Sequence, residues 1–305
     1  MLDKRLKWAF FLATLVLAGL PISGIILDVM NPGLGTPVQE RDNGSTKVVN
    51  ELRPSTQPPK EDMVFIPAGS FIRGYKEGGL DEKPEGHVMV DAFLIDRTEV
   101  TNAAYMAFVD STSHRKPISR YVKHFENLSG PNQPAVYVSW EDADAYCRHR
   151  GARLPTEAEW EKAARGPEGL LWAWGNQDVR GAANTGNPDS VEFTSPVGSF
   201  PKDLSPYGVF DMGGNAMEWV ADWYQEDAYK DDAPNPTGPA TGFYKVIKGP
   251  SWGTVGRETR LSLRLKMIPD FRDTTIGFRC AKSAQNGNTE GAQKSEKPKA
   301  NQSSR

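Results

Sequence analysis

Hydrophobic residues follow short, strand-like patterns at the start of what reads as a folded domain. The stretch MVFIPAGSFIRGY, from Met63, has two short apolar runs separated by Pro-Ala-Gly, which predicts a strand, a turn and a second strand. Between Val88 and Leu94 apolar residues recur at every second position, the period of a strand with one buried face. The domain therefore opens with short strands.

Helical signals follow in three places. Thr101 can cap a helix, and the segment VSWEDADAYCRHRG (138–151) predicts a second helix that ends at its final glycine. In LPTEAEWEKAARG, Thr156 and Glu159 form a capping box, and Gly166 closes the C-terminal end of a third helix.

Regular periodicity is scarce after this third helix. The chain runs through clusters of aromatic residues and glycine such as LWAWGN and DMGGNAMEWVADWY, which predict short strands and long ordered loops. A hydrophobic fraction of 38%, with 29 Gly, 23 Pro and 8 Trp, is typical of a loop-rich domain with an aromatic core. Loops of this length need metal ions or packed tryptophans to order them.

The two ends of the chain differ in composition from this domain. Basic residues precede an uncharged run of 20 residues, Trp8–Leu27, long enough to span a membrane as a helix. We predict an anchor over 1–30 that leaves the N-terminus cytoplasmic and the rest in the periplasm or cell exterior; a cleaved signal peptide is the competing interpretation. Residues 31–61 read as a Pro/Gly-rich linker, 62–282 as the domain and 283–305 as a disordered tail.

Charge and motifs exclude several classes of function. The 36 basic and 39 acidic residues are nearly balanced, so nucleic acid is not an expected partner. The chain has no P-loop, G-x-G-x-x-G or G-x-S-x-G. The four histidines, His87, His114, His124 and His149, lack the mutual spacing of zinc ligands and are interpreted as surface or linker residues.

Two other features leave alternatives open. The only cysteines, Cys147 and Cys280, lie in the exported part, which favours a disulfide over two separate buried thiols. The stretches DMGGNAMEW and ANTGNPDSVEF are rich in oxygen-bearing residues of the kind that bind Ca²⁺ in loops. Their acidic residues could instead pair with arginine or cap turns.

Several fragments together resemble the formylglycine-generating enzyme (sulfatase-modifying factor) family. FIPAGSFIRG, RLPTEAEWEKAARG, WAWGN, SPYGVFDMGGNAMEWVADWY, KVIKGPSW and the final GFRC stand in the order of that family, over about residues 62–282. The resemblance implies an α+β, C-type-lectin-like fold with little regular secondary structure.

The resemblance also implies two structural calcium loops and a disulfide. The positions that match the first loop are Asn184, Thr185, Asp189 and Val191, and those that match the second are Asp211, Gly214, Ala216 and Glu218. The first loop is shorter here than in the formylglycine generators. Cys147 and Cys280 stand where the family has a structural disulfide.

The oxidase site of the family is where this sequence departs from it. True formylglycine generators resemble copper enzymes, in which two cysteines after a Gly-Gly-Ser turn bind Cu(I) and activate O₂ to oxidise a sulfatase cysteine. Thiolates select Cu(I). Here the turn is GPSW, and counting from Trp252 the two positions are Thr254 and Thr259. Counting back from GFRC gives a different register, which also holds no cysteine, so we expect no copper.

The residues around this loop divide into two groups. Arg260, Arg264 and Arg272 match the wider family scaffold, so we interpret them as structural, pairing with acids or carbonyls around the GFRC strand. The residues that we expect to line a cleft are Trp252, Thr254, Arg257 and Glu258.

Three functions are compatible with these observations. The first is a membrane-anchored accessory or binding domain in an envelope or membrane protein complex. The second is a non-copper family enzyme that carries out an oxidative maturation step in the periplasm. The third, a true formylglycine-generating oxidase, conflicts with the missing cysteine pair.

Overall fold

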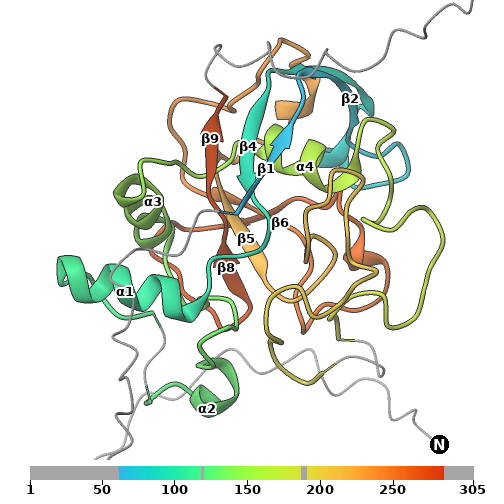
Figure 1. The fold of residues 1–305 in the computed structure, drawn as a ribbon. Coiled ribbons are helices and arrows are strands. Elements are labelled where there is room, and N and C mark those ends of the chain that lie inside the picture. Colours follow the sequence, from blue (N-terminus) through green and yellow to red (C-terminus); the bar gives the residue numbers. More distant parts are fainter. Residues whose placement is uncertain (1–61, 118–119, 187–190, 285–305) are drawn as a thin grey trace, which may run out of the picture. The chain divides into compact units, whose positions relative to one another are not determined.

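Short elements alternate with long loops in the computed structural model, which describes residues 62–117, 120–186 and 191–284 (Figure 1). The strands are β1 (Met63–Ile66), β2 (Gly69–Arg73), β3 (Gly86–Val90), β4 (Phe93–Asp96), β5 (Met217–Trp223), β6 (Lys245–Lys248), β7 (Leu265–Met267), β8 (Ile276–Phe278) and β9 (Ala281–Ser283). The helices are α1 (Asn102–Thr112), α2 (Phe125–Leu128), α3 (Trp140–His149) and α4 (Glu157–Arg165), with 3₁₀ turns η1 (Leu80–Glu82), η2 (Ala228–Lys230) and η3 (Gly256–Thr259).

The strands form three small sheets. Their orders are β1-β4-β9, β2-β3 and β7-β6-β5-β8. All pairs are antiparallel except β5 and β8, in which Trp219 lies opposite Phe278. The predicted strand, turn and strand are confirmed as β1 and β2, and the two strands join different sheets. The α+β class is confirmed.

The predicted C-terminal boundary is one residue short. Ser283 was assigned to the tail, but it ends β9 and lies opposite Phe93 of β4. The ladder continues because the N–H of Ala284 donates to the carbonyl of Ala92, at 3.3 Å. Edge strands often carry polar side chains, so composition alone did not show that Ser283 belongs to a strand.

The helix signals are confirmed at atomic level. The Thr101 hydroxyl accepts the N–H of Ala104 at 3.2 Å. Thr156 and Glu159 make both hydrogen bonds of the capping box, at 3.1 and 2.8 Å, and Gly166 caps the other end of α4 with φ 68°. The second helix, α3, ends at His149, two residues before the predicted glycine.

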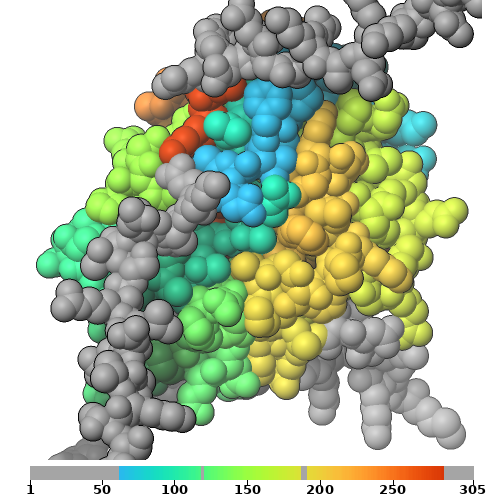
Figure 2. Space-filling view, in the orientation of Figure 1, coloured from blue at the N-terminus to red at the C-terminus, as the bar shows by residue number. Residues whose placement is uncertain are grey.

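Two aromatic clusters form most of the core. Trp160 of α4 packs with residues of β1–β4, whereas Trp219 of β5 packs with α1, α3 and β8; both indoles are fully buried. Figure 1 shows α1 and α3 beside each other and α4 beside β2. Figure 2 shows that the long segment between α4 and β5, in yellow and gold, covers much of the visible face. Both tryptophans belong to regular elements, and the expectation that packed tryptophans order the loops stays a prediction.

The terminal predictions fall on other parts of the chain. The anchor (1–30), the linker (31–61) and the tail beyond residue 284 lie outside the described residues. Within the described ranges, no helix is long and apolar enough to cross a membrane.

Candidate functional site

The loop after β6 is supported by its two threonines. The Thr254 hydroxyl accepts the N–H of Ser251 at 2.9 Å, and the Thr254 carbonyl accepts the N–H of Gly186 at 2.8 Å. Thr259 is buried, and its hydroxyl accepts the indole N–H of Trp172 at 3.1 Å. Both hydroxyls therefore hold the loop in place.

The other predicted cleft residues differ in how firmly they are held. Trp252 is half-buried, donates its indole N–H to the carbonyl of Thr274 at 3.2 Å, and lies with its ring 5.3 Å from that of Phe193. Arg257 and Glu258 are exposed on η3, and no hydrogen bond or ion pair within the described ranges fixes either side chain. A cleft lined by these residues stays a prediction.

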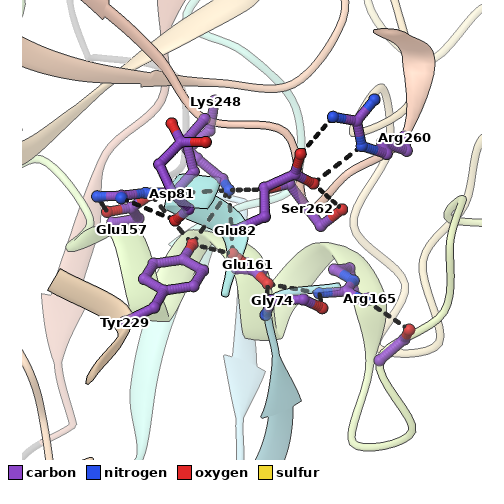
Figure 3. Close-up of polar contacts among 12 residues, drawn as sticks. Gly74, Asp81, Glu82, Glu157, Glu161, Arg165, Tyr229, Lys248, Arg260 and Ser262 are labelled. Atoms are coloured by element: carbon purple, nitrogen blue, oxygen red, sulfur yellow. Dashed lines mark hydrogen bonds and ion pairs between the residues drawn. The ribbon is translucent and has the colours of Figure 1, made fainter. Parts of the chain in front are cut away.

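Arg260 and Arg264 are structural, as predicted. Arg260 binds both carboxylate oxygens of Glu82, to which the Ser262 hydroxyl also donates at 2.7 Å (Figure 3). Arg264 is buried and binds both oxygens of Glu157, at 2.7 and 2.9 Å. Such bidentate pairs fix both partners in orientation.

The predicted location of these pairs is wrong. Glu82 lies in η1 and Glu157 opens α4, so the arginines reach across the domain instead of staying at the GFRC strand. Arg272 pairs with Asp142 of α3. Arginine side chains are long enough to reach elements that are distant in sequence.

A buried charge network continues from these pairs into α4. The Glu161 carboxylate accepts hydrogen bonds from Arg165 at 2.5 Å, Tyr229 at 2.5 Å and Lys248 at 3.0 Å (Figure 3). Burial alone would raise the pKa of Glu161, but the charges of Lys248 and Arg165 and the Tyr229 hydroxyl lower it to about 2. Glu161 therefore stays ionised at neutral pH.

The first predicted calcium loop contains a side-chain oxygen without a partner. Asn184 is buried and donates to the carbonyl of Phe193 at 2.9 Å, but its Oδ1 accepts no hydrogen bond from the residues that the structure describes. Thr185 is also buried, and Val191 is exposed. Asp189 lies outside the described residues. An unpaired buried amide oxygen costs free energy unless a donor or cation satisfies it.

The second predicted loop packs directly on the first. The N–H of Asn215 donates to the carbonyl of Asn184 at 2.7 Å, and a Cβ on Gly214 would lie 2.5 Å from that oxygen. Gly214 is therefore required for the close approach of the two backbones. Ala216 is buried just beyond.

Glu218, at the end of this loop, has an arginine partner. Both of its carboxylate oxygens accept hydrogen bonds from Arg279, at 2.7–2.9 Å, and Oε2 also accepts the indole N–H of Trp160. The alternative in which an acidic residue pairs with arginine thus holds for Glu218. Each carboxylate oxygen accepts two hydrogen bonds, which fill the acceptor sites of the side chain, and a role of Glu218 as a cation ligand stays a prediction.

Negative charge exceeds positive charge around this loop. Glu99, Asp203 and Asp211 are buried near Glu218, and Arg279 is the cation among them. Burial raises the pKa of Glu99 and of Asp203 well above the ordinary range, and the charge of Asp211 raises both further. The Glu99 carboxyl accepts the side-chain N–H of Asn215 at 3.0 Å and interacts with the carboxyl of Asp211. These features fit a bound hard cation, although within the described ranges no three Asp, Glu, His or Cys side chains gather as a metal site.

The predicted disulfide is confirmed. Cys147 and Cys280 are joined across 133 residues and link α3 to the segment between β8 and β9. Three histidines are exposed, as expected: His87, His124 and His149. His114 is different, because its Nε2 lies 2.9 Å from the buried carboxylate of Asp142.

Sequence reasoning missed several buried acids. Glu99 and Asp203 carry no local signal, because nothing in their segments marks them as buried. Asp222 has one: it shares a strand face with Glu218 and Val220, so an acid alternates with apolar residues. Asp222 lines a cavity of about 290 Å³, and none of the predicted cleft residues does.

Comparisons with known proteins identify the family. A family model described as the sulfatase-modifying factor enzyme 1-like domain matches residues 48–284. The chain belongs to this family. The match begins before the predicted boundary at residue 62, in residues that the structure does not describe.

Relatives within the sulfatase-modifying factor family carry different names. The chain is 34% identical to the formylglycine-generating enzyme of Bos taurus, over 75% of this chain and 76% of that protein. It is also 34% identical to serine/threonine-protein kinase pkn1 of Chlamydia caviae, over 77% of this chain but only 40% of the kinase. The chain thus spans about two-fifths of the length of that relative.

A solved structure supports the same assignment. PvdO from Pseudomonas aeruginosa is 30% identical and superposes with a TM-score of 0.64, over 73% of this chain and 94% of PvdO. The expected fold and family are confirmed.

Proposed function

We propose that this sulfatase-modifying factor domain works without copper, as an accessory or binding subunit of a membrane or envelope complex. The main support for the proposal is that the chain has no free cysteine to bind copper. The 305 residues contain two, Cys147 and Cys280, and both are in the disulfide. Cu(I) sites need soft ligands, which a hydroxyl cannot replace.

The bonding of the loop after β6 supports the same proposal. Thr254 and Thr259, which match the copper-binding cysteines when the positions are counted from Trp252, use their hydroxyls to hold the loop. Among the relatives, a mouse protein that is 32% identical is named inactive Cα-formylglycine-generating enzyme 2. The family fold therefore occurs in proteins that are not named as active oxidases.

The remaining parts of the proposal concern location and metal. The uncharged run Trp8–Leu27 would anchor the chain in a membrane and place the domain in the periplasm or cell exterior. Structural Ca²⁺ would be held at the loops of Asn184 and Asp211. The unpaired Asn184 Oδ1 and the excess of buried carboxyl groups near Asp211 support this part.

Extraction from native membranes in mild detergent, followed by native mass spectrometry and metal analysis, tests the proposal. We expect a complex with other subunits that contains calcium and no copper. A lone chain that carries copper would contradict it. The exposed side chain of Arg257 offers a matched pair of variants: Arg257→Glu should weaken the complex, whereas Lys202→Glu, at another exposed cation, should not.

The alternative is a non-copper enzyme that performs an oxidative maturation step. It is favoured by the placement of Trp252, Arg257 and Glu258 on one short segment, in which the two charged side chains are exposed. Under this alternative the purified chain would convert a candidate substrate by itself, and Arg257→Ala would abolish turnover without unfolding the domain. A true formylglycine generator would produce formylglycine in a co-expressed sulfatase, which we do not expect.

A further inference from the structure

A cavity of about 290 Å³ lies beside the first turn of α4, away from the loop after β6. Its walls come from β2, α4, the end of β5 and the segment that follows, and include Arg73, Glu157, Asp222, Tyr229 and Pro236. Since a water molecule takes about 30 Å³ in the liquid, the cavity has room for about ten groups of that size. This is the lower end of the range for small-molecule sites.

The buried side chain of Asp222 lines this cavity and forms no ion pair with any residue that the structure describes. Only 4% of the residue is exposed, and its Oδ2 accepts the N–H of Glu157 at 2.8 Å. Within the described ranges, Oδ1 accepts no hydrogen bond and the carboxylate has no ion pair. A Cβ on Gly238 would lie 3.5 Å from Oδ1, so Oδ1 faces the cavity wall around that glycine.

Two other charged residues that line the cavity, Glu157 and Arg73, already have hydrogen-bond partners. Glu157 binds the guanidinium of Arg264 with both oxygens and accepts the Tyr229 hydroxyl at 3.1 Å. Arg73 donates to the carbonyls of Tyr229 and Asp231 and lies over the Tyr229 ring, 4.4 Å from its centroid. Among the described residues, Asp222 is therefore the buried carboxylate of the cavity that forms no ion pair and has an acceptor oxygen available to a ligand.

We propose that this cavity binds a small primary alkylammonium group, with the Asp222 carboxylate as its counter-ion. A buried carboxylate is costly unless a cation neutralises it, and an ammonium supplies both charge and N–H donors. The aliphatic part of the ligand would contact Ala228, Pro236 and Pro239. An anionic ligand is disfavoured because the lining residues include four acids, Glu157, Asp222, Asp227 and Asp231, against one arginine.

This site is independent of the proposed function, because it uses neither the loop after β6 nor the N-terminal segment. Both a free amine and the lysine side chain of a peptide carry such an alkylammonium group. Calorimetric titration of the full chain, in mild detergent at pH 7.5, would use butane-1,4-diamine for the first source and Nα-acetyl-lysine methylamide for the second. Binding of either probe supports the proposal, and the tighter one indicates the source.

Three variants test the role of Asp222. Asp222→Asn keeps an acceptor for the N–H of Glu157 but removes the charge, so the fold is retained and affinity falls at least tenfold. Ala228→Leu fills the cavity without changing charge and should also weaken binding at least tenfold. Asp227→Asn, at an exposed acid on the rim, should change affinity less than threefold because solvent screens its charge.

A pH series gives a readout that a purely structural role would not produce. Burial, together with the charge of Glu157, raises the pKa of Asp222 to about 7. The charged groups that face Asp222 are Glu157 and Glu159 of α4, Arg153 before it, Lys245 of β6, and Arg73, Tyr229, Asp227 and Asp231 around the cavity. Burial lowers the pKa of Lys245 to about 8, so this group stays mostly protonated at pH 7.5.

Since only ionised Asp222 binds the ammonium, affinity should be about eightfold weaker at pH 6.0 than at pH 7.5, and Asp222→Asn should abolish this dependence. Two results would overturn the proposal: no binding of either amine at millimolar concentration, or equal affinity of the wild type and Asp222→Asn.

Discussion

Replacing Glu161 by glutamine tests whether the buried charge network holds α4 in the domain. Glu161 is fully buried, and its carboxylate accepts four hydrogen bonds, from the N–H of Gly74 and from Arg165, Tyr229 and Lys248 (Figure 3). Glutamine has the same shape, but it is neutral and replaces one acceptor oxygen by a donor. Whichever oxygen is replaced, two of the four partners lose their acceptor. Arg165 also loses the charge of Glu161, and Lys248 keeps only the carboxylate of Glu157, 3.8 Å away.

The size of the effect follows from the pKa of Glu161. The carboxyl has an ordinary pKa of 4.5, and the network lowers it to about 2. Since each pKa unit corresponds to about 1.4 kcal/mol, ionised Glu161 contributes about 3 kcal/mol to the free energy of unfolding at neutral pH. Removal of one partner from a buried ion pair costs a similar amount, about 3–5 kcal/mol. We expect Glu161→Gln to lose about 3–4 kcal/mol.

Urea unfolding followed by tryptophan fluorescence measures this loss. The folded-state pKa is lower than the unfolded one, so the contribution is complete above pH 4.5 and declines as the pH falls towards 2. The deficit of Glu161→Gln should therefore be about 1 kcal/mol smaller at pH 3.5 than at pH 6.5. Glu168→Gln, at an exposed position just beyond α4, is the matched control and should stay within about 0.5 kcal/mol of the wild type. A loss below about 1 kcal/mol at pH 6.5, or a deficit that is independent of pH, would refute the reasoning.

Three further predictions concern single features. Chelation with EGTA should lower the melting temperature by several degrees in differential scanning calorimetry, and Asp211→Ala should remove the sensitivity to chelator. Asp222→Asn should stabilise the domain by about 1–4 kcal/mol at pH 8 and not at pH 4, because the raised pKa of Asp222 makes ionisation unfavourable in the folded state. The double replacement Cys147→Ser and Cys280→Ser should cost about 5 kcal/mol in urea unfolding, since the bond closes a loop of 133 residues.

Features that depend on neighbouring residues were predictable from sequence. The caps at Thr101 and Thr156 form because a hydroxyl next to a helix start meets free N–H groups within three residues. The strands β1 and β2 follow from short apolar runs on either side of a turn. Such signals lie in one window of sequence, so no knowledge of the rest of the fold is needed.

Pairings between distant residues were not predictable in the same way. Arg260 and Glu82 are 178 residues apart, and Arg264 and Glu157 are 107 apart. The spacing of apolar residues indicates that an arginine lies near the core. It does not identify the acidic residue with which the arginine forms an ion pair. For the same reason the sequence indicated Asp211 and Glu218 as possible cation ligands but could not show that Arg279 occupies the carboxylate of Glu218.

The residues of the segment after β6 divide into a part that stabilises the fold and a part that is exposed. Arg260, Ser262 and Arg264 bind the buried acids Glu82 and Glu157, so this part of the segment is tied to η1 and α4 whatever precedes it. In the preceding η3, Thr259 is buried, whereas the side chains of Arg257 and Glu258 are exposed and contribute little to the core. Substitutions at Arg257 and Glu258 can therefore change chemistry or partner choice at small cost in stability, because function resides in sites carried by a fold that is stabilised elsewhere.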